Sequence, residues 1–101
     1  MIRTMIVDDE AYARKGIISL FPWGKYGMQV AGEAASGEKA LEWMERHPID
    51  ILFTDLTMPG MSGLELIREA ARRHADLKSV VLTCHQDFGY IQEALRLGAI
   101  D

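Results

Sequence analysis

The sequence predicts an α/β fold in which a doubly wound parallel sheet has helices on both faces. Short apolar runs at residues 5–7, 28–31, 49–53 and 80–82 alternate with longer segments that have helical periodicity. The runs are rich in β-branched residues and are nearly continuous in apolar character, as is typical of strands buried on both faces. Strands that alternate with helices pair in parallel through right-handed crossovers, so we expect a doubly wound α/β sheet.

The first two helices are expected at residues 10–20 and 37–46. Both segments place apolar residues on one side of a helix, which is the pattern of a helix packed on a sheet. These residues are Ala13, Ile17 and Leu20 in the first segment, and Ala40, Leu41 and Met44 in the second.

The third helix has the clearest local signal for its start. Ser62 and Glu65 have the spacing of a capping box, in which each side chain accepts a hydrogen bond from the other residue's main chain. Leu64, Ile67 and Ala71 form the apolar stripe expected to be buried. The sequence therefore predicts a helix that begins directly after Ser62.

A fourth helix is expected from about Asp87, a suitable N-cap, to Gly98, which can end a helix in the left-handed conformation. The chain ends at Ala99-Ile100-Asp101, where a fifth strand would normally begin. We therefore expect four strands, with the fifth strand and the last helix missing from the chain.

Composition limits the classes of protein to consider. With 101 residues and 49% hydrophobic content, the chain is expected to form a single domain over residues 1–101. A net charge of -4, with the basic pairs Arg14-Lys15 and Arg72-Arg73 far apart in sequence, argues against nucleic-acid binding. A single cysteine, Cys84, fits a reducing compartment, and no run approaches the roughly 20 apolar residues of a membrane span. A cytoplasmic protein without a membrane partner is expected.

Carboxylates follow two of the predicted strands. Asp8 and Asp9 come directly after the first strand and Asp55 closes the third, while Thr83 ends the fourth. Because ligands of open α/β sheets bind at the carboxyl ends of the strands, we expect these side chains to share one crevice. Clustered carboxylates repel one another unless a cation intervenes, and Mg²⁺ prefers such oxygen ligands. With the cation bound, Asp55 could act as a nucleophile toward phosphorus.

Four segments together resemble the receiver domain of bacterial two-component response regulators. They are Val7-Asp8-Asp9-Glu10, the run 54–63 that begins Thr54-Asp55 and ends Ser62-Gly63, Leu82-Thr83, and the run 94–99. The resemblance covers essentially the whole chain and implies the flavodoxin-like receiver fold. Residues 21–28 are similar to the longer first loop of receivers that precede AraC-type DNA-binding domains.

The resemblance implies a role for each site residue. Asp55 would accept a phosphoryl group from a sensor histidine kinase. Asp9 would bind Mg²⁺ directly, Asp8 mainly through water, and Thr57 through its main-chain carbonyl. Thr83 would donate a hydrogen bond to the phosphoryl group as a switch residue, and the amide of Cys84 would contact it.

The chain departs from the family pattern at its end, because receivers carry a lysine and a switching aromatic residue on the fifth strand. Neither has a counterpart in residues 1–101, so the chain is interpreted as a truncated receiver. An uncovered fourth strand is expected to promote a homodimer or a strand-exchanged oligomer. DNA would be bound only through a C-terminal domain that residues 1–101 do not include.

Three other classes remain open at the level of sequence. A haloacid-dehalogenase-type phosphatase also forms aspartyl phosphates, but its Asp-x-Asp motif differs from Asp8-Asp9-Glu10. A flavodoxin-like FMN carrier needs hydroxyl and amide donors where this chain has carboxylates. A receiver-like scaffold that is never phosphorylated would not need the intact set of acids.

Overall fold

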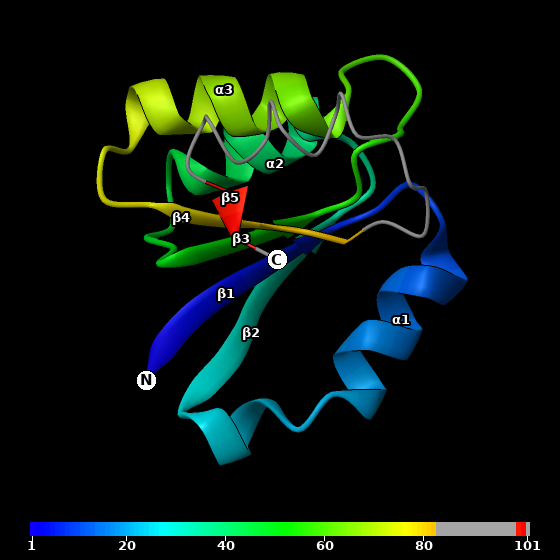
Figure 1. The fold of residues 1–101 in the computed structure, drawn as a ribbon, viewed down its shortest axis with the longest axis vertical. Helices are drawn as coiled ribbons and strands as arrows, with labels where there is room; N and C mark the ends of the chain where they lie inside the picture. The colour runs from blue at the N-terminus through cyan, green and yellow to red at the C-terminus, as the bar shows by residue number, and fades with distance from the viewer. Residues whose placement is uncertain (83–98, 101) are drawn as a thin grey trace.

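The computed structural model describes residues 1–82 and 99–100. Five parallel strands form one sheet in the order β2-β1-β3-β4-β5 (Figure 1). Their bounds are Ile2–Val7 for β1, Met28–Ala34 for β2, Ile51–Thr54 for β3, Lys78–Val81 for β4 and Ala99–Ile100 for β5. β2 pairs with one edge of β1 and β3 pairs with the other, so the direction in which successive strands are added to the sheet reverses after β2. This confirms the predicted doubly wound sheet.

Helices connect the first four strands, as the alternating pattern predicts. They are α1 (Ala11–Leu20), α2 (Gly37–Met44) and α3 (Gly63–Arg73), with a short 3₁₀ helix, η1 (Trp23–Tyr26), before β2. In the described part of the chain, no helix combines the length and apolar character that crossing a bilayer requires.

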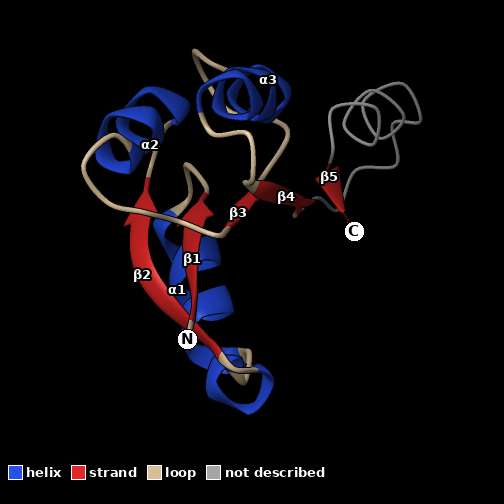
Figure 2. Cartoon of the chain, turned by 90° about the vertical axis from the view of Figure 1, so that its left-hand side faces the viewer, coloured by secondary structure: helices blue, strands red, loops and turns tan. Residues whose placement is uncertain are grey.

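The two faces of the sheet are covered differently. Helices α2 and α3 lie side by side on one face, and α1 lies on the other (Figure 2). The main apolar core lies under α2 and α3, where alternate residues of β1 and β3 meet one side of each helix. Its members from these elements are Met5, Val7, Leu52, Ala40, Leu41, Met44, Leu66 and Ala70.

The face that carries α1 includes a buried aromatic residue from outside that helix. None of the residues of α1, all of which the structure describes, is buried, and Leu20 is 84% exposed. Trp23 of η1 is buried instead, with its ring edge-on to Phe53 at 5.2 Å and its Nε1 donating to the carbonyl of Ile18 at 3.1 Å. The expected apolar side of this helix is therefore only half-buried at Ala13 and Ile17 and ends in solvent at Leu20.

The start of α3 confirms the capping box. The Ser62 side chain accepts from the Glu65 amide at 3.1 Å, and the Glu65 carboxylate accepts from the Ser62 amide at 3.3 Å. The buried stripe is rotated relative to the prediction: Leu66, Ile67 and Ala70 are fully buried, whereas Ala71 is exposed. The helix turns its Leu66 side toward the sheet because β1 and β3 supply the deep core there.

The prediction that the fifth strand is missing is wrong in one respect. Ala99 and Ile100 form β5, which pairs in parallel with residues 79 and 80 of β4. Two extended residues are enough to continue the ladder on the open edge of β4, although no strand-length apolar run marks them in the sequence. Self-association through the rest of that edge stays a prediction. The expected fourth helix, from about Asp87 to Gly98, lies outside the described residues.

Candidate acidic metal site

Three carboxylates meet at the carboxyl ends of β1 and β3. Asp8 and Asp9 follow β1, Asp55 follows β3, and these two strands are neighbours in the sheet. One carboxylate oxygen from each residue lies within 4.8 Å of the others. Asp8 is buried with 6% of its surface exposed, Asp55 is half-buried and Asp9 is exposed, so the cluster has an inner wall and an open side.

Main-chain hydrogen bonds hold the turn that carries Asp8. The Asp8 amide donates to the carbonyl of Ala34 at 3.2 Å, which extends the β1–β2 ladder by one residue. The Asp8 Oδ1 atom accepts from the amide of Glu10 at 2.9 Å, which closes a turn directly before α1. The turn therefore orients the Asp8 carboxylate by a contact that leaves its other oxygen available for a ligand.

Asp55 is fixed from both sides. Its amide donates to the carbonyl of Val7 at 3.1 Å, and its Oδ1 atom accepts from the amide of Thr57 at 3.3 Å. The first residue of α3 packs directly on this segment: a Cβ added at Gly63 would lie 1.9 Å from the carbonyl oxygen of Asp55. Only glycine allows that approach, so the start of α3 helps to place the central carboxylate.

The electrostatics of the cluster favour a cation. Burial raises the pKa of Asp55, and the negative charges of Asp8 and Asp9 raise it further, whereas hydrogen bonds from the Thr57 and Leu56 amides oppose the shift. A bound cation would stabilise the ionised form of all three acids. Three clustered carboxylate oxygens are hard ligands, so the donor set fits Mg²⁺.

The structure brings together most of the residues predicted for the site. Asp8, Asp9 and Asp55 form the cluster, and Thr57 contacts it through its amide. Thr83 and Cys84 lie outside the described residues, so their roles stay predictions. Sequence reasoning named Gly63 only as the end of a motif and gave it no role, because its close packing appears only in three dimensions. It treated Arg14 only as part of a basic pair.

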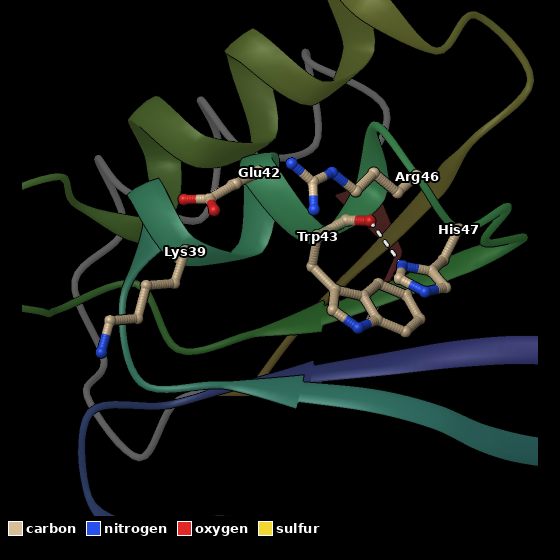
Figure 3. A pocket seen from close by; sticks show the side chains of 5 residues that line it. All are labelled: Lys39, Glu42, Trp43, Arg46 and His47. Carbon is tan, nitrogen blue, oxygen red and sulfur yellow. Dashed lines mark hydrogen bonds between the residues drawn. The ribbon is translucent and has the colours of Figure 1, made fainter.

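A shallow hollow elsewhere is chemically different from the acidic cluster. It lies beside α2 and the turn that follows it, and is lined by Lys39, Glu42, Trp43, Arg46 and His47 (Figure 3). The His47 ring stacks on Trp43 at 4.1 Å, and its Nδ1 atom lies 3.0 Å from the Trp43 carbonyl. None of these five described residues belongs to the predicted site.

Comparison with known families decides the class of protein. A family described as the response regulator receiver domain matches residues 4–101. The chain belongs to this family. Among curated relatives, this receiver domain is similar to the response regulator UvrY of Escherichia coli K12, with 37% identity over 99 residues. That match covers 98% of the chain but 45% of UvrY, so the chain spans less than half the length of this relative.

Solved structures agree with the receiver fold. The REC domain of AraT, a response regulator from Geobacillus stearothermophilus, is 42% identical with a TM-score of 0.87, over 97% of this chain and 76% of that one. A chain of the CheX–CheY–BeF₃–Mg²⁺ complex from Borrelia burgdorferi is 25% identical to this chain, with a TM-score of 0.86. That match covers 97% of this chain and 73% of the other.

Family membership gives the domain its general role and separates the alternatives. A receiver domain of a response regulator is a phosphoacceptor signalling domain, and this is the role of the chain. The comparisons give no support to a haloacid-dehalogenase-type phosphatase.

Proposed function

We propose that Asp55 is the residue that accepts the phosphoryl group, with Mg²⁺ bound by Asp8, Asp9 and Asp55. The observation that carries this proposal is the convergence of three carboxylates within 4.8 Å at the carboxyl ends of adjacent strands. Among the three acids, Asp55 is held by contacts with the main chain of Val7, Thr57 and Gly63, which fix its position. The Mg²⁺ of the CheX–CheY complex from Borrelia burgdorferi supports the choice of cation.

The chemistry assigned to Asp55 is nucleophilic. One carboxylate oxygen forms a bond to phosphorus while the bond from phosphorus to the imidazole nitrogen of the donor breaks, and the imidazole keeps the electron pair. A bound Mg²⁺ would supply charge neutralisation for this transfer. The Thr57 amide holds Oδ1 of Asp55, which fixes the direction from which the other oxygen can attack. The carbonyl of Thr57 is proposed as a further ligand of the cation.

The proposed partner is a sensor histidine kinase, and residues 1–101 are proposed to act as one receiver unit. The open side of the acidic cluster, at the exposed Asp9, is where a phosphorylated histidine could approach. Thr83 and Cys84 are proposed to contact the phosphoryl group after transfer. Binding of DNA is proposed only for a segment beyond residues 1–101.

Phosphorylation by a small donor tests the assignment of Asp55. The full-length protein is incubated with acetyl phosphate and Mg²⁺, and the addition of one phosphoryl group is followed by intact-mass spectrometry. We expect labelling of the wild type and of the control Asp76→Asn, an exposed acid outside the cluster, but not of Asp55→Asn. Removal of divalent cations with EDTA should abolish labelling of the wild type. Persistent labelling of Asp55→Asn would refute the assignment, and labelling that is unchanged in EDTA would refute the role of the metal.

A further inference from the structure

The side chain of Arg14 connects three elements behind the acidic cluster. Arg14 lies in the first half of α1, and its Nη1 atom donates to the main-chain carbonyl of Asp8 at 2.7 Å. Its Nε atom donates to Oε1 of Glu33 on β2 at 2.8 Å. One planar guanidinium thus joins the end of β1, helix α1 and strand β2.

These bonds complete the restraint of the Asp8 peptide. The amide of Asp8 is already bonded to Ala34 of β2, and the Arg14 bond now holds its carbonyl. With both main-chain groups fixed, the direction of the Asp8 Cα–Cβ bond is fixed, and the Glu10 amide holds the carboxylate at its Oδ1 atom. The carboxylate is therefore held toward Asp55 before any cation arrives.

The position of the charge matters as much as the bonds. Arg14 donates to the carbonyl of Asp8 and to the carboxylate of Glu33. In these bonds its guanidinium group does not pair with the carboxylates of the cluster. The Arg14 side chain is only 15% exposed, whereas that of Glu33 is 46% exposed. A charged donor shielded from water makes a stronger and less easily exchanged bond than a surface ion pair does.

We infer that Arg14 is a positioning residue for the metal site: it sets the main chain of the Asp8-Asp9 turn, and Glu33 orients its guanidinium. This inference rests on the proposed function of the cluster. It predicts that loss of Arg14 lowers Mg²⁺ affinity more than it lowers the stability of the cation-free fold. Groups one step removed from the metal are known to change affinity by 10-fold or more.

The test measures Mg²⁺ binding and cation-free stability separately in the full-length protein. Mg²⁺ is titrated calorimetrically into the wild type, Arg14→Ala, Arg14→Lys and the control Arg46→Ala, which removes an exposed arginine from the hollow on α2 (Figure 3). We expect about 10-fold weaker binding for Arg14→Ala. Arg14→Lys should recover only part of the loss, because lysine keeps the charge but lacks the planar fork. Arg46→Ala should bind Mg²⁺ as the wild type does.

Glu33→Ala provides a second variant, which decides the question if Arg14→Ala does not fold. It removes the group that orients Arg14 without changing α1, and we expect Mg²⁺ binding to weaken by roughly 2-fold to 5-fold, less than on loss of Arg14 itself. Wild-type affinity in Arg14→Ala, or in Glu33→Ala where the former is unfolded, overturns the inference and leaves the proposed function intact. Full recovery by Arg14→Lys also overturns it, because charge alone would then be sufficient. A wild type that binds no Mg²⁺ would instead overturn the proposed function itself.

Discussion

The two faces of the sheet are stabilised by different means. Under α2 and α3, a continuous apolar core joins β1 and β3 to helices that bury Ala40, Leu41, Met44 and Leu66. On the other face, no residue of α1 in the described chain is buried, and Trp23 from η1 lies against Phe53 instead. The polar side chain of Arg14 anchors α1 to the strands.

This difference suggests that one face of the sheet contributes mainly to stability and the other mainly to the geometry of the acidic cluster. Apolar burial is the larger contribution to folding, so the α2 and α3 face should carry most of the stability. Helix α1 buries none of its residues, but its Arg14 side chain supplies a bond that holds the Asp8-Asp9 turn. Mutations should therefore affect the free energy of unfolding on one face and the properties of the acidic cluster on the other.

The largest expected effect compares one leucine from each face. Leu66→Ala removes a fully buried side chain from the core under α3 and should lower the free energy of unfolding by about 3 kcal/mol. Leu20→Ala changes a residue of α1 that is 84% exposed and should alter it by less than about 0.5 kcal/mol. Urea denaturation of both variants measures the difference. Equal losses would show that the two faces do not differ as described.

A pair of glycines tests the same contrast through the backbone. Gly63→Ala places a methyl group against the Asp55 carbonyl and should cost about 2 kcal/mol, together with slower phosphorylation of Asp55. Gly16→Ala meets nothing within 4 Å on α1 and should stabilise the helix by roughly 0.5–1 kcal/mol. Thermal unfolding and acetyl phosphate labelling are the measurements. A harmless Gly63→Ala would mean that α3 does not place the central carboxylate.

The acidic cluster at the carboxyl ends of β1 and β3 should make the stability of the fold depend on pH. Because the folded pKa of Asp55 is raised above the ordinary 3.8, protonated Asp55 is favoured by folding. Its contribution to stability is full below the ordinary pKa and is lost as the pH rises through the folded value. Without divalent cations, Asp55→Asn should therefore be more thermostable than the wild type at pH 7, with the difference shrinking toward pH 4.

Thermal unfolding in EDTA at several pH values measures this effect. Added Mg²⁺ should reverse the order, because it stabilises the wild type but binds the amide variant more weakly. A wild type that is more stable than Asp55→Asn in EDTA at pH 7 would contradict the raised pKa.

The smallest effect is expected on the outer surface of α3. Hydrogen bonds from Arg72 and Arg73 lower the pKa of Glu69 from 4.5 to about 2. Its contribution to stability is present above pH 4.5 and is lost as the pH falls toward 2. Glu69→Gln should therefore lower the free energy of unfolding slightly at neutral pH and leave it unchanged in acid. High salt should reduce the difference between this variant and the wild type. A pH-independent loss in this variant would point to a packing role instead.

Much of the site could be predicted because each acid directly follows a strand-like run. Asp8 and Asp55 lie at the ends of β1 and β3, and parallel strands bring their carboxyl ends to one edge. Arg14 and Gly63 could not be found in this way. The partners of Arg14 are a main-chain carbonyl and a residue 19 positions away, and the close contact of Gly63 depends on how α3 returns over β3.

Local chemistry in the sequence determined the alternating elements, the capping box at Ser62 and the choice of three carboxylates. These follow from interactions between residues close in the chain, or from the rule that strand ends share an edge. Only the tertiary structure decided which side of α3 is buried, that Trp23 is buried on the second face while Leu20 is exposed, and that two residues at 99–100 form β5. Each of these depends on contacts between distant segments, whose energies are set by packing rather than by local sequence.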